Sequence, residues 1–177
     1  MKESAAFVKF YQGGIFMADE KNLARAKQVY QTICKMMDQE KWKCKKDDEK
    51  LSIEAGAQGE DLPMELVIRV DAERQLVMIL SHLPYKIPED KRLDVAVAVS
   101  AINNLLVHGA MDFNVTDGNL FFRMASSFMD SDMGADAYRY MMYASCQTID
   151  EYNDKLLMLS KGIVDISKFL EMLKEKK

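Results

Sequence analysis

Few side chains in this sequence could carry out catalysis. Its two histidines, His82 and His108, are the only imidazole groups that could act as bases or metal ligands. His82 falls at the end of an expected strand, and His108 in the last turn of an expected helix, where an imidazolium suits the helix dipole. The motifs of nucleotide-binding loops, zinc proteases and serine hydrolases are absent. We therefore expect structural roles for both histidines, no cofactor and no enzymatic activity.

One acidic group has the chemistry of a cation site. Asp130, Asp132 and Asp136 share one polar stretch, and carboxylates are calcium ligands. Their spacing lacks the twelve-residue pattern with its closing glutamate. Helix capping by Asp132 is the simpler interpretation, so we expect no metal site.

Composition and charge exclude several classes of protein. The net charge of −4 gives no general attraction to nucleic acid or to an anionic membrane. No apolar run approaches membrane-spanning length, and no signal-peptide pattern follows Lys2. The three cysteines, Cys34, Cys44 and Cys146, lie far apart without a CxxC pair, which suits a reducing compartment. We expect a cytoplasmic protein.

The hydrophobic pattern predicts an α+β fold. Asp19 opens a helix to about Gln39, and period-two alternation then predicts four strands. Pro88 and Gly109 bound the next helix, which precedes a hairpin and a long amphipathic helix. The predicted order is α-β-β-β-β-α-β-β-α, an antiparallel sheet with helices mainly on one face. The four early strands are expected at 41–45, 51–55, 64–70 and 76–80, and the last long helix at 138–159, with a capping box from Thr148 to Glu151 and a short terminal helix at 165–173.

The hairpin has a register that can be predicted. Asp117-Gly118 is favoured in a two-residue type I′ turn. With that turn, Phe113 lies opposite Phe122, and Asp112 lies opposite Arg123 as an ion pair.

The helix between Leu93 and Val107 is apolar around most of its circumference. Such a helix is covered on more than one side, and a second copy of the chain is one possible cover. The 14 methionines fit either an irregular core or an adaptable binding surface. Four apolar residues lie on faces that the first core does not account for, and we treat them as candidates for a partner or dimer surface, with a second core layer as the alternative: Val77, Ile79, Val97 and Phe121.

The function that this pattern favours is a non-enzymatic, dimeric adaptor that holds an extended segment of a client protein by backbone pairing. A small-molecule sensor is the alternative. Its pocket would lie between sheet and helix, near Tyr85, Asn103 and Arg123.

We expect an N-terminal extension, residues 1–18, ahead of a single α+β domain at 19–177. The extension is rich in apolar residues, among them Phe7, Phe10 and Phe16. It is predicted to form a short amphipathic helix that docks on the body of the protein or on a second subunit.

Over about residues 40–162 the sequence resembles the YbjN-like family, bacterial proteins described as sensory-transduction regulators. The order and spacing of several short segments carry the resemblance: Leu83-Pro84, Ile102-Asn103, Gly109, the run from Asp117 to Arg123, and the helix from Ile149 through Tyr152 to Gly162. The resemblance implies a fold similar to the type III secretion chaperones, which are homodimers that hold unfolded client segments.

Overall fold

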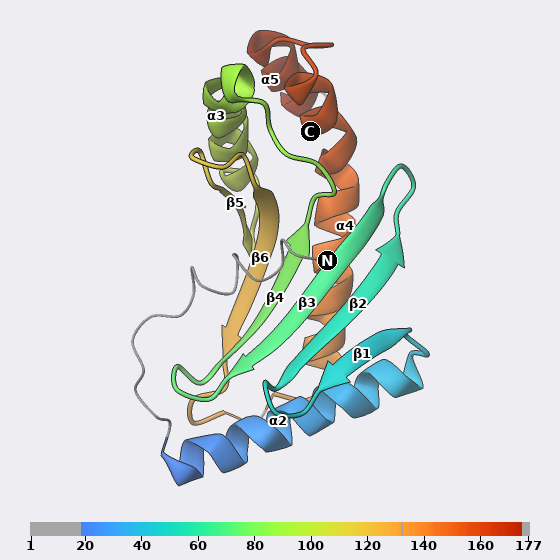
Figure 1. Ribbon diagram of the computed structural model, residues 1–177, viewed down its shortest axis with the longest axis vertical. Helices are drawn as coiled ribbons and strands as arrows, with labels where there is room; N and C mark the ends of the chain where they lie inside the picture. Colours follow the sequence, from blue (N-terminus) through green and yellow to red (C-terminus); the bar gives the residue numbers. More distant parts are fainter. Residues whose placement is uncertain (1–18, 132, 175–177) are drawn as a thin grey trace.

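The computed structural model describes residues 19–131 and 133–174. Within these ranges the chain forms one six-stranded sheet and four α-helices (Figure 1). The elements are α2 (Glu20–Gln39), β1 (Cys44–Asp47), β2 (Ser52–Gln58), β3 (Pro63–Asp71), β4 (Leu76–His82), the 3₁₀ turn η1 (Glu89–Lys91), α3 (Arg92–Asn103), β5 (Ala110–Phe113), β6 (Leu120–Ser127), α4 (Ala135–Ser160) and α5 (Ile166–Lys174).

The strands are ordered β1-β2-β3-β4-β6-β5, and every neighbouring pair is antiparallel. The long α4 packs on β4 and β6, and α2 packs against α4 and β3. The other two helices, α3 and α5, pack against each other, with α3 also against β5 (Figure 1). The predicted α+β architecture, an antiparallel sheet with its helices on one side, is confirmed.

Alternation along the strands decides which residues enter the core. On β3 the side chains of Met64, Leu66, Ile68 and Val70 face the helices, while Val67 and Arg69 face away. These core residues share one hydrophobic cluster with buried side chains of all four helices. Burial of the apolar face of a sheet against helices is the main favourable term in such a fold.

The start of α2 follows from one side chain. Asp19 has an extended backbone conformation, and its carboxylate accepts a hydrogen bond from the Asn22 backbone N–H at 2.7 Å. This is N-capping, because the first N–H groups of a helix have no partner within it. The predicted start is confirmed.

The boundaries of the first strands differ from the prediction. β1 begins at Cys44 rather than at 41, because Lys41 has a positive φ of 57° and the Trp42 N–H bonds back to the Met37 carbonyl. The next turn holds Leu51 at a φ of 50°, so β2 begins at Ser52. Both turns use the left-handed region, which most non-glycine residues avoid and which sequence patterns therefore do not predict.

The predicted end of the central helix is wrong. α3 stops at Asn103, well before Gly109. Gly109 instead leads into β5 with a φ of 74°, and a Cβ there would lie 2.3 Å from the ring of Phe122. The glycine is needed where the chain crosses close to β6, not as a helix cap.

The predicted register of the hairpin is also wrong. Met111 pairs with Phe122, and Phe113 pairs with Leu120. The Asn114 N–H bonds to the Asn119 carbonyl at 2.9 Å, so four residues rather than two form the loop. The pairing is shifted by two residues, and a shift of two leaves every side chain on its predicted face.

At α4, the predicted capping box is absent because the helix runs unbroken from Ala135 to Ser160. The Thr148 hydroxyl donates to the Ala144 carbonyl one turn earlier instead. The N-cap position of this helix is Gly134. Asp132, the predicted cap, lies outside the described residues.

The position of Phe122 predicts a large effect on stability. Phe122 is fully buried in the core cluster, whereas Phe113 is only partly buried at its edge. Phe122→Ala should lower the free energy of unfolding by about 3–5 kcal/mol because it removes a buried ring and leaves a cavity. Phe113→Ala should lower the free energy of unfolding by clearly less. Urea unfolding of both variants measures the difference, and equal costs would contradict this account of the core.

A second effect on stability is expected at Gly118. Its φ is 77°, and a Cβ would lie 2.4 Å from the Ile87 carbonyl oxygen. Gly118→Ala should therefore lower the free energy of unfolding by more than about 1 kcal/mol. Gly56→Ala is the matched control, since its Cβ would make only an ordinary contact at 3.7 Å. Thermal unfolding of both variants is the measurement, and a control that loses as much as Gly118→Ala would refute the steric explanation.

Candidate functional site

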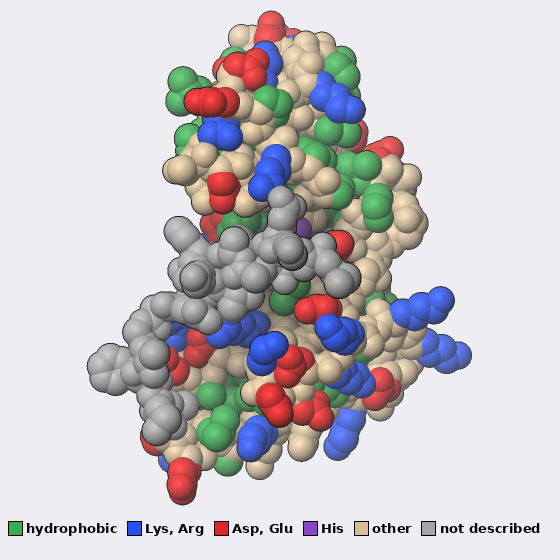
Figure 2. Space-filling view, in the orientation of Figure 1, with side chains coloured by type: hydrophobic (Ala, Val, Ile, Leu, Met, Phe, Trp, Pro, Cys, Tyr) green, Lys and Arg blue, Asp and Glu red, His purple; other side chains and the backbone are tan. Residues whose placement is uncertain are grey.

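The face of the sheet turned away from the helices carries a small apolar surface. We call Val67, Met78, Leu80 and Phe121 the open-face patch. Alternation turns these residues away from the helices, and the register places Leu80 directly between Val67 and Arg123. Met78, Leu80 and Phe121 are only 4%, 6% and 4% exposed, yet none of the three belongs to the main core cluster. Figure 2 shows basic and acidic side chains mixed over the lower half of the view, with no large area of one sign.

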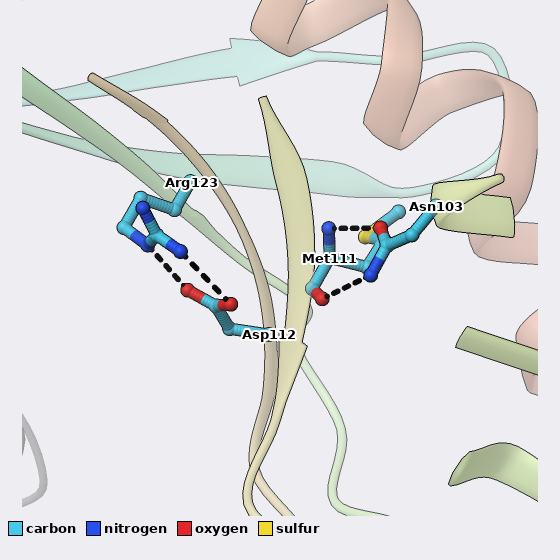
Figure 3. Close-up of polar contacts among 4 residues, drawn as sticks. All are labelled: Asn103, Met111, Asp112 and Arg123. Carbon is cyan, nitrogen blue, oxygen red and sulfur yellow. Dashed lines mark hydrogen bonds and ion pairs between the residues drawn. The ribbon is translucent and has the colours of Figure 1, made fainter. Parts of the chain in front are cut away.

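An ion pair borders the patch. The Arg123 guanidinium donates from Nε to Asp112 Oδ2 at 2.5 Å and from Nη2 to Oδ1 at 3.2 Å (Figure 3). Asp112 is paired with Phe121 in the ladder, so the ion pair is diagonal rather than directly across. The predicted contact forms in spite of the shifted register, because a long arginine side chain reaches a diagonal neighbour.

Asn103 closes one edge of the sheet. Its side-chain amide donates from Nδ2 to the Met111 carbonyl at 3.0 Å and accepts at Oδ1 from the Met111 N–H at 2.8 Å (Figure 3). β5 is the last strand on this side, so these backbone groups point away from β6. One amide thus replaces one residue of a neighbouring strand, which protects an otherwise open edge.

The three residues predicted to line a ligand pocket do not come together. Arg123 faces the open side of the sheet, whereas Asn103 reaches β5 from the helix α3. The Tyr85 hydroxyl donates to the Asn153 carbonyl of α4 at 2.8 Å, and burial raises the pKa of this phenol. Each side chain therefore has a structural partner of its own.

Asn153, a buried polar residue that our sequence analysis missed, lies on α4. Its side chain is fully buried, and neither end of its amide has a hydrogen-bond partner within the described residues. The Ser81 hydroxyl of β4 is likewise buried without a partner there. Asn153 lies one turn after the buried Ile149, so an amide on the apolar side of this helix was the available signal. Buried amides without partners are rare and costly.

The four residues predicted to form a partner surface have three different environments. Val77 and Ile79 are buried in the main core beneath the helices, so a partner cannot reach them in this conformation. Phe121 lies in the open-face patch. Val97 is 52% exposed on α3, one turn after Leu93, which is 78% exposed.

The exposed side of α3 forms a narrow stripe. It consists of Leu93, Val97, Ser100 and Asn104, which recur at helical spacing and are all exposed. We call it the α3 stripe. The sequence predicted that this helix is covered on more than one side. In the single chain one side of it is uncovered.

Two of the cysteines, Cys34 and Cys146, have thiols that burial keeps protonated. Burial raises the pKa of the Cys34 thiol, and burial and Asp150 raise that of Cys146 to about 11. A thiol held protonated is a poor nucleophile. Within the described ranges no group of three potential ligands could hold a metal ion, and none of the helices there is long and apolar enough to cross a membrane.

The family model described as "Putative bacterial sensory transduction regulator", YbjN, matches residues 30–158. The chain belongs to the YbjN family. None of the curated proteins matches the sequence of this YbjN family member.

The solved structures similar to this YbjN family member include the following three. The first is YbjN, "a putative transcription regulator from E. coli", with 14% identity and a TM-score of 0.52 over 71% of this chain and 91% of that one. The second belongs to the ExsC–ExsE complex, with 9% identity and a TM-score of 0.56 over 74% and 95%. The third belongs to the HopA1–SchA chaperone–effector complex, with 12% identity and a TM-score of 0.51 over 77% and 98%. The predicted likeness to type III secretion chaperones is confirmed at the level of the fold.

His82 gives a prediction for pH. Its ring lies 5.6 Å from that of Phe121, and burial lowers the pKa of the imidazole, with Glu65 opposing the shift. Below the ordinary value of about 6.5 the unfolded chain therefore binds a proton more readily than the folded chain. The free energy of unfolding should fall as the pH is lowered through this range, and His82→Gln should flatten the dependence.

The only other histidine, His108, is the matched control. Its Nδ1 lies 2.8 Å from the Tyr140 hydroxyl in an exposed contact. Urea midpoints of wild type, His82→Gln and His108→Gln on either side of about pH 6.5 make the comparison. An unchanged slope in His82→Gln would show that His82 does not cause the dependence.

Proposed function

We propose that this protein is a non-enzymatic adaptor that acts in the cytoplasm as a homodimer and holds an extended segment of a client protein. The observation that carries the proposal is its fold. Two of the similar structures are complexes with a partner protein, and one of these is a chaperone–effector complex. The family description, a regulator, fits the same kind of activity.

The two edge strands of the sheet, β5 and β1, differ in how readily they could pair with an extended client segment. At β5 the amide of Asn103 already occupies the backbone groups of Met111, so an added strand would have to displace it. β1 is the other edge. Its exposed Lys45 makes a surface ion pair with Glu54 of β2, at 3.7 Å, and its Lys46 pairs with Asp38 of α2 at 2.6 Å. We place client binding at β1, where backbone pairing would supply affinity.

We place the dimer contact at the α3 stripe. Two small or apolar stripes on facing helices permit close approach of the helix axes. The neighbouring apolar residues Leu105 and Val107, which follow the helix, are exposed as well. Of the residues predicted to form a partner surface, Val97 would lie in this contact, whereas Val77 and Ile79 belong to the core.

Tagged capture of the full chain from its native lysate tests the adaptor function. Mass spectrometry and light scattering of the eluate should show one protein bound at a fixed ratio to a dimer of this chain. A clean dimer that holds no other protein would contradict the adaptor and favour a sensor. A clean monomer would contradict the dimer.

A specific observation favours the sensor as the second candidate. Among the described residues, the Asn153 amide and the Ser81 hydroxyl have no hydrogen-bond partner, and they are buried on α4 and β4, two elements that pack together. A small polar ligand would satisfy both groups. In that case a set of small polar compounds should contain one that raises the melting temperature of wild type but not of Asn153→Leu, because only a ligand that prefers the folded state stabilises it.

The α3 stripe gives the prediction for assembly. Val97→Glu should convert the dimer into a monomer, because it places a charge at the centre of an apolar contact. Light scattering across a concentration series is the measurement. Leu23→Glu is the matched control, since Leu23 is an exposed apolar residue on α2, at the other end of the molecule (Figure 1). Dissociation by both substitutions, or by neither, would remove the α3 stripe from the interface.

A further inference from the structure

The outer edge of β1 carries two exposed lysines on one face. Lys43 directly precedes β1, and Lys45 is the second residue of the strand, so the two side chains leave the chain on the same side. The register places Lys45 beside Glu54, in the row that continues to Val67 on the side of the sheet away from the helices. Figure 2 shows basic side chains projecting at the lower right-hand margin of the molecule, where Figure 1 places β1. We call Lys43 and Lys45 the lysine pair.

The charges of the lysine pair are only weakly compensated by the chain itself. Among the described residues Lys43 makes no ion pair. The ladder pairs Cys44 with Ala55, so the next residue of β2 beside Lys43 is Gly56, which has no side chain. The ion pair of Lys45 with Glu54 is long, at 3.7 Å, and its two side chains are 80% and 60% exposed. Surface pairs of this kind contribute little free energy, so both ammonium groups remain available to another carboxylate.

Two of the three acidic residues that follow the lysine pair have partners of their own. Asp47 pairs with Lys50 of the same turn, at 3.1 Å. Asp48 accepts a hydrogen bond from the Tyr30 hydroxyl of α2, at 2.8 Å. These contacts hold the two carboxylates at the turn and on the helix side, so neither of them compensates the lysine pair.

The backbone of β1 is available on the same edge. Its only partner strand is β2, and no backbone–backbone hydrogen bond outside the helices and the sheet involves residues 43–47 within the described part of the chain. Alternate N–H and C=O groups of an edge strand point outward. Between the two lysines, Cys44 faces the helix side and packs, partly buried, against the core. An added strand would therefore meet a lysine, a partly buried apolar residue and a second lysine in succession.

We propose that the client segment paired with β1 carries two acidic residues separated by one apolar residue. This inference rests on the client site proposed above and names the chemistry that the site selects. Side chains two residues apart have the same spacing on neighbouring strands, so both carboxylates meet the lysine pair in one register, with the apolar residue beside Cys44. The same lysines repel strands that bring positive charge, which makes the edge selective.

A nucleic acid suits this edge less well than an acidic peptide. The whole chain has a net charge of −4, and three acidic residues follow the lysine pair at 47–49. An extended peptide uses the outward backbone groups of β1 and both ammonium groups together. A phosphate chain would use the charges alone.

Fluorescence anisotropy of the full-length protein with short labelled peptides tests the proposal. In three of the peptides valine alternates with glutamate, glutamine or lysine. In a fourth, proline replaces valine between the glutamates, which keeps the charge and removes the backbone pairing. Wild type should bind the glutamate–valine peptide about tenfold more tightly than the glutamine–valine peptide, with a ratio that falls as salt is added. The proline peptide should bind far more weakly than the glutamate–valine peptide.

Charge-reversed variants identify the residues responsible. Lys43→Glu with Lys45→Glu should reverse the preference, so that the lysine–valine peptide binds more tightly than the glutamate–valine peptide. Lys43→Gln with Lys45→Gln should remove the preference without placing a negative charge beside Glu54. The matched control is Lys21→Glu with Lys27→Glu, which changes the net charge equally at two exposed positions in the first turns of α2. This control should retain the preference of wild type.

Four outcomes would overturn the proposal. Equal affinity for the glutamate–valine and glutamine–valine peptides would refute the acidic selectivity, and strand addition at β1 would survive if the proline peptide still failed to bind. Equal affinity for the two glutamate peptides would show a contact through charge alone. Tighter binding of single-stranded DNA, lost in Lys43→Gln with Lys45→Gln, would assign the edge to nucleic acid. Failure of every peptide to bind would also refute the client site at β1, whereas the adaptor function itself fails only if capture from the lysate yields no client.

Discussion

The structure depends on β4, a strand with apolar residues on both faces. Its odd-numbered residues, Val77 and Ile79, anchor the helices, and its even-numbered residues, Met78 and Leu80, point to the opposite side. A strand of this kind is typical of the middle of a sheet. β4 lies there, between β3 and β6.

The features that depend on neighbours close in sequence could be predicted. Alternation on β3 identified its core face, and the acidic cap at Asp19 located the start of α2. The faces of the hairpin residues were also correct, since they depend only on period two. These signals are local, and tertiary contacts did not override them.

The features that depend on distant contacts could not be predicted. The hairpin loop is held by Ile87, whose N–H bonds to the Gly118 carbonyl at 2.9 Å, and no rule for a two-residue turn includes that contact. The end of α3 depends on Asn103, whose amide is used by a strand that follows it in the sequence. Of the candidate site residues, Val77 and Ile79 proved to be core because an alternating pattern does not say which face of a central strand meets the helices.

The two hydrogen bonds between Asn103 and Met111 protect the β5 edge of the sheet only while helix α3 is folded. The outward backbone groups of Met111 in β5 are bonded to a side chain that stays in position only while α3 is folded. Local opening of α3 therefore uncovers unpaired backbone groups and apolar helix residues in the same event. Exposed strand edges pair readily with other chains. Aggregation of this protein would then begin from partial opening of one short helix, and its rate would follow the stability of that helix rather than the stability of the whole fold.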